Sequence, residues 1–357
     1  MDVLDFQVRK DDLRTTAWVS TTLPALAEGQ ALLKVGKFAL TANNITYAAV
    51  GDMARYWQFF PAVEGWGRIP VWGFAEVAQS KVEGLAVGER LYGYFPMSSH
   101  LVVSVDRLSD RGFVDATPHR ASLPPVYNQY IRVAADASFA ALSEDVQAIF
   151  RPLFMTSFLI DDVLADSAFF GADSVILSSA SSKTSLGTAF ALARRGGVVE
   201  IVGLTSPANL DFVKSLGLYD RVLLYSDIKS MPVTPSVFVD IAGDSVVRRA
   251  VHERLTDALT YSCGVGFTHW DVARDTNPLP GPAPAMFFAP DVIRKRSQDW
   301  GPAGFDQRYA PVWADFARFA EGWLDVVTSA GQAQIDSAYA QVVNGRAPAH
   351  TGHILSV

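Results

Sequence analysis

The chain has 357 residues, 49% of them hydrophobic, so it can fill two cores of ordinary size. Its formal net charge of −7, without a long basic run, gives no electrostatic footprint for nucleic acid or an acidic membrane. One cysteine, Cys263, excludes an intrachain disulfide and a zinc site built from several thiolates. The N-terminal stretch alternates charged and apolar residues where a signal peptide would be apolar, and we expect a cytoplasmic protein without a membrane span.

The first third of the chain is predicted to be mostly β. Short apolar runs lie between closely spaced glycines and other turn residues, at 31–40, 71–80, 90–96 and 101–105. Strands of this length joined by tight turns are typical of an antiparallel barrel or sandwich. We therefore expect a compact β domain in this part of the chain.

A different pattern starts near Ser143. Apolar residues at helical spacing predict a buried helix over 143–164, in which Pro152 is expected to cause a kink. Strands and helices then alternate, with strands predicted at 173–178, 197–203, 220–226, 236–243, 258–266 and 284–290, and helices at 184–195, 206–217 and 244–255. This alternation predicts a doubly wound parallel sheet. Cys263 is expected inside one of its strands, as a buried and inert thiol.

The last segment is predicted to contain a helix over 314–327 and a strand over 352–357. We expect this tail to return to the β domain, because no helix follows the strand to make another crossover. The predicted domains are therefore residues 1–135, completed by 312–357, and residues 136–311. The fold class is α/β, with a β-barrel domain and a doubly wound parallel sheet domain of the Rossmann type.

The turn after the first strand of the parallel sheet has the sequence SSASSKTSLG, at residues 178–187. In such a sheet this turn lies at the ligand crevice, and the next helix presents free N–H groups to an anion. A P-loop would need glycine where Leu177 and Ser182 stand, and these side chains would crowd the phosphates of a nucleotide. An ordinary turn with a serine N-cap and a solvent-facing lysine is a second interpretation.

A third interpretation is a dinucleotide site in which serine replaces glycine. Ser179, Ser182 and Ser185 fall on the three glycine positions of a G-x-x-G-x-x-G turn. Serine is small, and its hydroxyl can donate a hydrogen bond to a phosphate oxygen. The candidate phosphate-binding residues are then Ser181, Ser182, Lys183 and Thr184, with Lys183 supplying the positive charge.

Several segments resemble the medium-chain dehydrogenase/reductase superfamily, in the same order along the chain. Residues 174–225 are similar to its cofactor domain, and residues 28–52 and 73–96, which include VGERLYG, are similar to its GroES-like first domain. RPLFMTSF at 151–158 and the residues 344–357 resemble further parts of it. The resemblance implies a GroES-like β-barrel domain, a Rossmann domain and a nicotinamide cofactor.

The chain also departs from the superfamily pattern. WGFAEV at 72–77 stands where zinc-dependent members carry Gly-His-Glu, and the structural-zinc cysteines are missing. A catalytic zinc needs about three Cys, His or acidic ligands, and the six histidines are scattered. The resemblance is therefore to the zinc-independent quinone oxidoreductase and enoyl reductase branches, and no metal is expected. The missing loop glycines suggest a separate branch.

The end of the second strand of the cofactor domain bears on which cofactor binds. NAD-dependent folds place an acidic residue there, roughly 20 residues after the glycine loop, to bind the ribose 2′-hydroxyl. This chain has Gly-Leu-Thr-Ser at 203–206. A 2′-phosphate can then be accepted, with Thr205, Ser206 and either Lys214 or Asn209 as donors, so NADP(H) is favoured over NAD(H). Thr205 and Ser206 would also serve merely to cap the next helix.

The resemblance implies candidates for the nicotinamide end of the cofactor, which are Thr156, Gly266, Thr268, His269 and Phe288. The segment TANNITY at 41–47 lies where superfamily members approach the substrate.

Without zinc, the substrate must be polarised by hydrogen-bond donors. Asn44 or Tyr47 would hold a carbonyl oxygen while hydride moves to the β-carbon of an enone, and Tyr47 would then protonate the α-carbon. Asn43 and Tyr56 are further candidate donors. Alternatively, the asparagines form a turn and Tyr47 belongs to the core. The aromatic-rich segment 55–74 is either an apolar lid over a planar substrate or a filler between domains.

These observations predict a zinc-independent, NADPH-dependent oxidoreductase that transfers hydride to an activated double bond, a quinone or a carbonyl. Its substrate would be an apolar or planar small molecule. The alternative is a cofactor-binding sensor on the same fold that has lost turnover. No nucleic-acid partner is expected, and an edge strand of the cofactor sheet would allow a homodimer.

Overall fold

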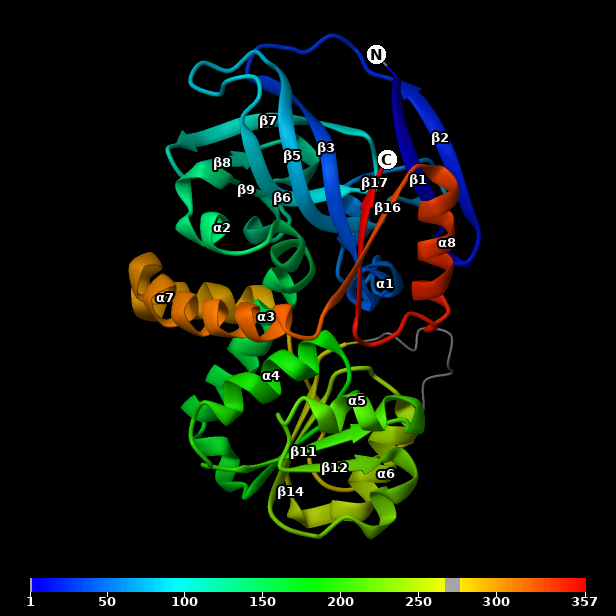
Figure 1. Cartoon of the computed structure of the whole chain (residues 1–357), viewed down its shortest axis with the longest axis vertical. Coiled ribbons are helices and arrows are strands. Elements are labelled where there is room, and N and C mark those ends of the chain that lie inside the picture. Colours follow the sequence, from blue (N-terminus) through cyan, green and yellow to red (C-terminus); the bar gives the residue numbers. More distant parts are fainter. Residues whose placement is uncertain (1, 267–276) are drawn as a thin grey trace. The chain divides into compact units, whose positions relative to one another are not determined.

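The protein divides into two compact units in the computed structural model, which describes residues 2–266 and 277–357 (Figure 1). Unit 1 comprises Met1–Arg151 and Ala317–Val357, and unit 2 comprises Pro152–Phe316. The two boundaries fall inside helices α3 (Glu144–Asp166) and α7 (Ala289–Glu321). Each unit is described by itself below.

Unit 1 is built from β-strands. They are β1 Asp2–Arg9, β2 Thr16–Thr22, β3 Gln30–Leu40, β4 Trp66–Gly67, β5 Pro70–Ser80, β6 Arg90–Pro96, β7 His100–Ser109, β8 Gly112–Asp115, β9 Gln129–Arg132, β16 Asp325–Ala330 and β17 Thr351–Ser356. Its helices are α1 Ala42–Ala49, α2 Ala137–Ala141 and α8 Gln332–Val343, with 3-10 turns η1 Tyr56–Gln58, η2 Pro118–Arg120, η3 Pro125–Asn128 and η4 Val133–Ala135.

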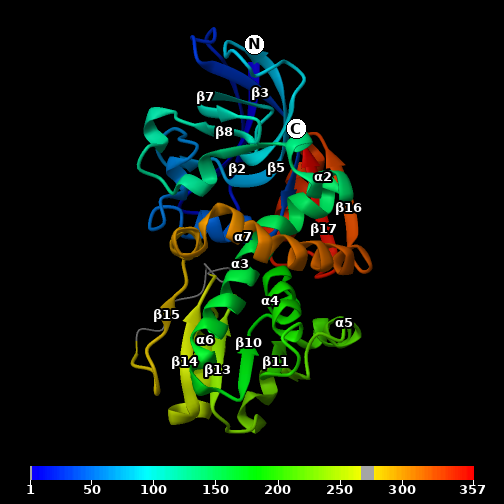
Figure 2. The same cartoon turned by 90° about the vertical axis from the view of Figure 1, so that its left-hand side faces the viewer.

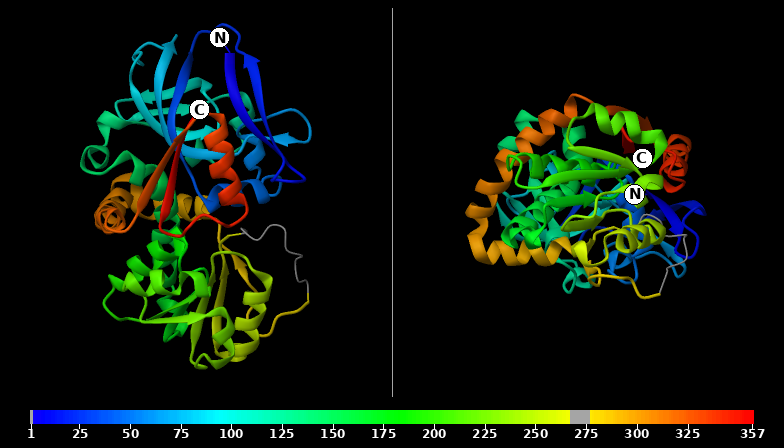
Figure 3. Two further views of the ribbon diagram at one scale, coloured as in Figure 1. Left: turned by 45° about the vertical axis from the view of Figure 1, so that its right-hand side comes forward. Right: turned by 90° about the horizontal axis from the view of Figure 1, so that it is seen from below.

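Six of these strands close into a barrel. β3 pairs with both β5 and β7, and the pairings β5–β6, β6–β9, β9–β8 and β8–β7 complete the ring. β17 and β16 extend the sheet from β3, and they run side by side in Figure 3. A separate sheet has the strand order β2-β1-β4. The predicted barrel is confirmed.

Unit 2 is a parallel sheet with helices. Its strands are β10 Ser174–Leu177, β11 Glu200–Thr205, β12 Arg221–Leu224, β13 Ser236–Asp240, β14 Leu259–Gly264 and β15 Ala285–Met286. Its further helices are α4 Lys183–Ala193, α5 Leu210–Ser215 and α6 Ser245–Leu255, with 3-10 turns η5 Ala168–Gly171, η6 Pro207–Asn209, η7 Tyr225–Ser230 and η8 Thr256–Ala258.

The strand order of unit 2 is β12-β11-β10-β13-β14-β15, and every pairing is parallel. The order runs in opposite directions from β10, so the switch point lies between β10 and β13, which neighbour each other in Figure 2. The predicted doubly wound sheet is confirmed. Ligands of such sheets bind outside the carboxyl ends of the strands at this point.

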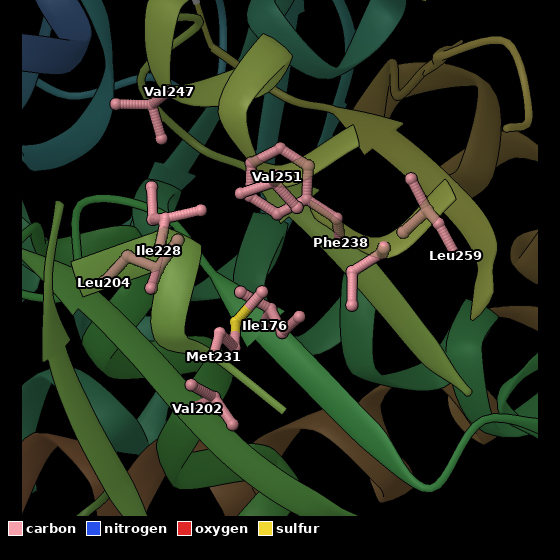
Figure 4. Close-up of a cluster of buried hydrophobic side chains, with 10 residues drawn as sticks. Ile176, Val202, Leu204, Ile228, Met231, Phe238, Val247, Val251 and Leu259 are labelled. Atoms are coloured by element: carbon pink, nitrogen blue, oxygen red, sulfur yellow. The ribbon is translucent and has the colours of Figure 1, made fainter. Parts of the chain in front are cut away.

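One face of this sheet is covered by α6 and η7 (Figure 4). Ile176, Val202 and Phe238 come from three neighbouring strands, and Val251 of α6 packs with them. All four side chains are buried. The parallel strands are apolar because both of their faces are covered.

Three sequence-based expectations need correction or refinement. The helix predicted over 314–327 is wrong in its second half, because α7 ends at Glu321 and the chain continues as β16. Val326, Val327 and Thr328 are β-branched and pair with β17, which outweighs the helical spacing. The helix predicted over 143–164 is α3, which runs from Glu144 to Asp166 with Pro152 inside it, and the expected kink stays a prediction. The strand predicted at 284–290 shrinks to the two residues of β15.

No helix in the described part of the chain combines the length and apolar character that crossing a bilayer requires.

We expect Phe238→Ala to lower the free energy of unfolding by about 3–5 kcal/mol, because the ring is fully buried at the centre of the unit 2 core. Urea unfolding of the full chain measures this change. The control is Val246→Ala on α6, whose side chain is 71% exposed. Equal changes for the two variants would contradict this description of the core.

Candidate functional site

The turn at residues 178–182, which we call the serine turn, joins β10 to α4 at the carboxyl edge of the unit 2 sheet. Ser179, at the first predicted glycine position, has a φ of 48°, in the left-handed region that glycine adopts most easily. Ser182 is the N-cap of α4 and its hydroxyl accepts a hydrogen bond from the Ser185 N–H at 3.2 Å. Ser185, at the third position, is buried and donates to the Ser178 carbonyl at 2.6 Å. Of the three serines, Ser179 adopts a backbone conformation that glycine favours, whereas Ser182 and Ser185 form hydrogen bonds that hold the turn to the start of α4.

A buried carboxylate, that of Asp240, is hydrogen-bonded to this turn. Asp240, the last residue of β13, is 1% exposed and accepts a hydrogen bond from the Ser178 hydroxyl at 3.0 Å. Arg248 of α6 donates to the other carboxylate oxygen at 2.8 Å, and the Gly243 N–H also donates to Asp240. The Ser178 hydroxyl accepts from the Ile241 N–H at 2.8 Å. Burial raises the pKa of Asp240, and the neighbouring Arg248 opposes that rise.

Two phenols from the β12 side of the sheet bind the same turn. The Tyr225 hydroxyl accepts from the Ser179 N–H at 3.1 Å, and the Tyr219 hydroxyl donates to the Ala180 carbonyl at 2.8 Å. The Tyr219 ring passes so close to Gly203 that a Cβ there would lie 2.8 Å from the ring. Gly203 is therefore required by this contact. Burial raises the pKa of both tyrosines, so their hydroxyls stay protonated at neutral pH.

Much of the backbone of this turn is already hydrogen-bonded. The Ala180 N–H donates to the Leu204 carbonyl at 2.9 Å, and the Ser182 N–H donates to the Ser179 carbonyl at 2.7 Å. The predicted phosphate-binding residues Ser181, Lys183 and Thr184 lie just before and in the first turn of α4, and their side chains are all partly buried. Desolvation lowers the pKa of Lys183 to about 8.

The end of β11 lies next to this turn, because β11 pairs with β10. Thr205 is 1% exposed, and its hydroxyl has no hydrogen-bond partner among the residues that the structure describes. A buried hydroxyl without a partner is costly, so a ligand that bonds to it would be favoured. Ser206 precedes η6 and accepts from the Asn209 amide at 3.3 Å, while Lys214 is exposed on α5.

Of the predicted nicotinamide residues, Thr156, Gly266 and Phe288 are described and lie in unit 2. Gly266 approaches β13 so closely that a Cβ would lie 2.0 Å from the Ile241 carbonyl oxygen, one residue beyond Asp240. Phe288 directly precedes α7, and Thr156 donates within α3 to the Pro152 carbonyl at 3.4 Å. Gly266 is thus placed at the same sheet edge as the serine turn. Thr268 and His269 fall outside the described residues.

The predicted catalytic residues lie in unit 1, on helix α1. The Asn44 side chain accepts from the Thr41 N–H at 2.7 Å in a capping box and donates to the Pro70 carbonyl at 2.9 Å. Asn44 is 3% exposed, so its bonds hold α1 against β5. Its role as a substrate donor stays a prediction.

Tyr47 belongs to a cluster of buried tyrosines. Its ring lies 4.5 Å from Tyr56 and 5.7 Å from Tyr94, measured between ring centroids, and its hydroxyl accepts from the Trp72 indole at 3.3 Å. The hydroxyls of Tyr56 and Tyr127 are 3.0 Å apart. Burial raises the pKa of all four tyrosines, so each remains a proton donor at neutral pH. We call Tyr47, Tyr56, Tyr94 and Tyr127 the tyrosine cluster.

Sequence reasoning found only part of this cluster. Tyr47 and Tyr56 were within reach because they flank one segment of the chain. Tyr94 of β6 and Tyr127 of η3 are brought in by the barrel, and the Tyr94 hydroxyl is buried without a hydrogen-bond partner among the described residues. No local pattern in the sequence indicates that Tyr94 and Tyr127 lie beside Tyr47 and Tyr56.

Metal binding has no candidate among the described residues, where no group of three His, Cys, Asp or Glu side chains is arranged to hold an ion. Zinc independence stays a prediction. Cys263 is 3% exposed in β14, as expected, and burial raises the pKa of its thiol to about 12.

Comparison with known proteins gives one family and many similar folds. The family described as "Protein of unknown function (DUF2855)" matches residues 38–348. No curated protein matches the chain. A mutant form of enoyl thioester reductase from Candida tropicalis is 11% identical with a TM-score of 0.60, and 100% of each chain is covered. TarJ from S. aureus in complex with NADPH is 9% identical with a TM-score of 0.59, and 100% of this chain and 99% of that chain are covered.

A third similar structure is the Etr1p/NADP/crotonyl-CoA complex, which is 11% identical with a TM-score of 0.58, and 100% of each chain is covered. At such identities the similarity concerns the fold. The chain has the fold of the medium-chain dehydrogenase/reductase superfamily, with a GroES-like barrel and a Rossmann sheet, as its sequence segments predicted.

We expect Ser178→Ala to lower the free energy of unfolding by about 1–3 kcal/mol, because it leaves Asp240 and the Ile241 N–H short of a buried partner. Chemical denaturation measures this loss. The matched control is Ser215→Ala, an exposed serine whose hydroxyl donates to the Phe212 carbonyl of its own helix, for which a change within about 0.5 kcal/mol is expected. A silent Ser178→Ala would show that the turn does not depend on this hydroxyl.

Proposed function

The chain belongs to the family described as "Protein of unknown function (DUF2855)", and we propose that it is an NADPH-dependent oxidoreductase. Its acceptor would be an activated double bond, a quinone or a carbonyl on an apolar or planar small molecule. The observation that carries the proposal is the carboxyl edge of the unit 2 sheet. There the serine turn and the start of α4 lie at the switch point of a Rossmann sheet, and Thr205, whose hydroxyl has no partner among the described residues, ends the neighbouring strand β11.

The choice of NADPH is supported by the groups at the end of β11. Residues 203–206 include no carboxylate that would repel a 2′-phosphate. Thr205 offers a buried hydroxyl, and Ser206 and Lys214 offer further donors nearby in the chain. Two proteins of similar fold, TarJ and Etr1p, are described as complexes with NADPH and NADP. The pyrophosphate would be bound by Ser181, Ser182, Lys183 and Thr184.

NADPH, when bound, supplies the hydride. The chain's own contribution at the acceptor would come from hydrogen-bond donors, and Tyr47 is the proposed one. Its hydroxyl accepts from the Trp72 indole, so its own proton is directed elsewhere. Burial raises its pKa, which keeps the proton in place at neutral pH until a developing oxyanion or carbanion accepts it. Thr156, Gly266 and Phe288 are proposed to line the nicotinamide, with Thr268 at the same end.

We expect NADPH to quench or shift the intrinsic fluorescence of the protein on titration and Lys183→Ala to weaken its binding at pH 7 about tenfold or more, because a charge-assisted bond to phosphate is lost. The control is Lys229→Ala, an exposed lysine of η7, which should leave the Kd unchanged. No binding of NADPH or NADH by the unmodified chain would contradict the proposed function.

The same titration should depend on pH. The amine of Lys183 is charged below its pKa of about 8 and neutral above it. An anion is attracted only by the charged form, so the Kd for NADPH should rise as the pH is raised from 7 to 9. In Lys183→Ala the rise should disappear. A Kd with equal pH dependence in both proteins would remove Lys183 from the phosphate site.

We expect Tyr47→Phe to lower kcat for NADPH oxidation about 100-fold, since the proton donor is removed while the ring is kept. Acceptor-dependent loss of absorbance at 340 nm measures the rate, and the Kd for NADPH should not change. The control is Tyr92→Phe, a tyrosine of the same barrel that stacks on Trp72 with ring centroids 5.7 Å apart. Equal losses in the two variants, or none in Tyr47→Phe, would exclude Tyr47 as the donor.

A further inference from the structure

A buried ion pair lies beside the tyrosine cluster in unit 1. Arg120 of η2 and Asp115 of β8 are each 1% exposed in their side chains, and the guanidinium Nη1 is 2.9 Å from the carboxylate. Asp115 is held in turn by the N–H groups of Ser104 and Thr117 and by the Thr117 hydroxyl. Burying two charges is costly unless each is paired and hydrogen-bonded. The pair therefore fixes the position of the guanidinium.

The same arginine bonds to three separate segments that carry tyrosines of the cluster. Its Nε donates to the Phe59 carbonyl at 3.2 Å, next to η1 with Tyr56. Its Nη1 lies 3.4 Å from the Tyr130 hydroxyl, which donates to the Tyr94 carbonyl at 2.8 Å. This second route reaches β6 through one phenol.

The third segment is reached through the backbone of Arg120. Its carbonyl accepts from the Asn128 amide at 3.3 Å, at the end of η3, which carries Tyr127. The guanidinium also lies 4.6 Å from the centre of the Phe60 ring. Arg55, at the start of the aromatic segment, donates to the Ser122 carbonyl just after η2.

We propose that Arg120 is a positioning residue that holds Tyr56, Tyr94 and Tyr127 around Tyr47 in the arrangement that proton donation to the acceptor requires. The inference rests on the proposed function for its catalytic part. The contacts favour this role over simple support of the barrel, because the guanidinium bonds to the Phe59 carbonyl and to the Tyr130 hydroxyl while the backbone of the same residue bonds to Asn128. An amine on a flexible chain could pair with Asp115 but could not also bond to the Phe59 carbonyl and the Tyr130 hydroxyl.

Two conservative variants test this role, and both keep the buried apolar side chains of the barrel in place. Arg120→Lys keeps a cation for Asp115 but loses the planar guanidinium with its several donors. Tyr130→Phe removes only the hydroxyl that lies between Arg120 and the Tyr94 carbonyl. The control is Arg132→Met, which breaks a 2.8 Å ion pair with Glu89 elsewhere in the barrel. For each, thermal unfolding, the Kd for NADPH, kcat and KM, and hydrogen–deuterium exchange of the full chain are measured.

Arg120→Lys should lower kcat about 10- to 100-fold at unchanged Kd for NADPH, in protein that is fully folded at the assay temperature. Exchange should accelerate at residues 55–60 and 125–130 and stay as in the unmodified protein elsewhere in the barrel. Tyr130→Phe should lower kcat by a smaller factor, and Arg132→Met should leave it within about twofold.

Different results separate the two claims. A kcat that merely follows the folded fraction of Arg120→Lys, or unchanged exchange at both segments, would overturn the positioning role. If the unmodified protein binds NADPH but does not oxidise it in the presence of any quinone, enone or carbonyl acceptor, the proposed function fails. The exchange data then still decide whether Arg120 holds the tyrosine segments.

Discussion

The buried carboxylate of Asp240 is the constraint on which the candidate cofactor edge depends. A carboxylate that is 1% exposed must keep its partners, which include Arg248 on α6 and Ser178 at the end of β10. Together they fix the carboxyl ends of β10 and β13, the two strands that flank the switch point. Ser179, which has a left-handed backbone conformation, is the next residue after Ser178. Its N–H donates to the Tyr225 hydroxyl, so this conformation is held from both sides.

Both units use a similar device. In unit 2 a buried aspartate, Asp240, pairs with the partly exposed Arg248 next to the turn that is proposed to bind phosphate, and in unit 1 Arg120 and Asp115 are both buried beside the tyrosine cluster. In each case the ion pair is hydrogen-bonded to a segment next to side chains that are proposed to carry function. Loops bring chemistry to a site, and rigid polar anchors give them one geometry.

Local patterns in the sequence predict much of this structure. Alternating strands and helices after Ser143 are enough for the Rossmann sheet, and its topology places residues 178–187 at the ligand edge. Thr41 and Asn44 also have capping-box spacing, so the structural role of Asn44 was within reach. The phenol of Tyr219 could not be predicted, because it reaches Ala180 only through the pairing of distant strands. For the same reason no local pattern predicts the tyrosine cluster. The residues of β16 were predicted as part of a helix because the pairing of this strand with β17 cannot be seen in the local sequence.

The most direct test of the central claim is a crystal structure of the unmodified chain grown with NADPH. The account predicts the pyrophosphate against the first turn of α4, with Ser181, Lys183 and Thr184 in contact, and the 2′-phosphate beside Thr205. A nucleotide bound elsewhere, or a serine turn that stays unliganded at saturating NADPH, would contradict the assignment of this sheet edge as a dinucleotide site.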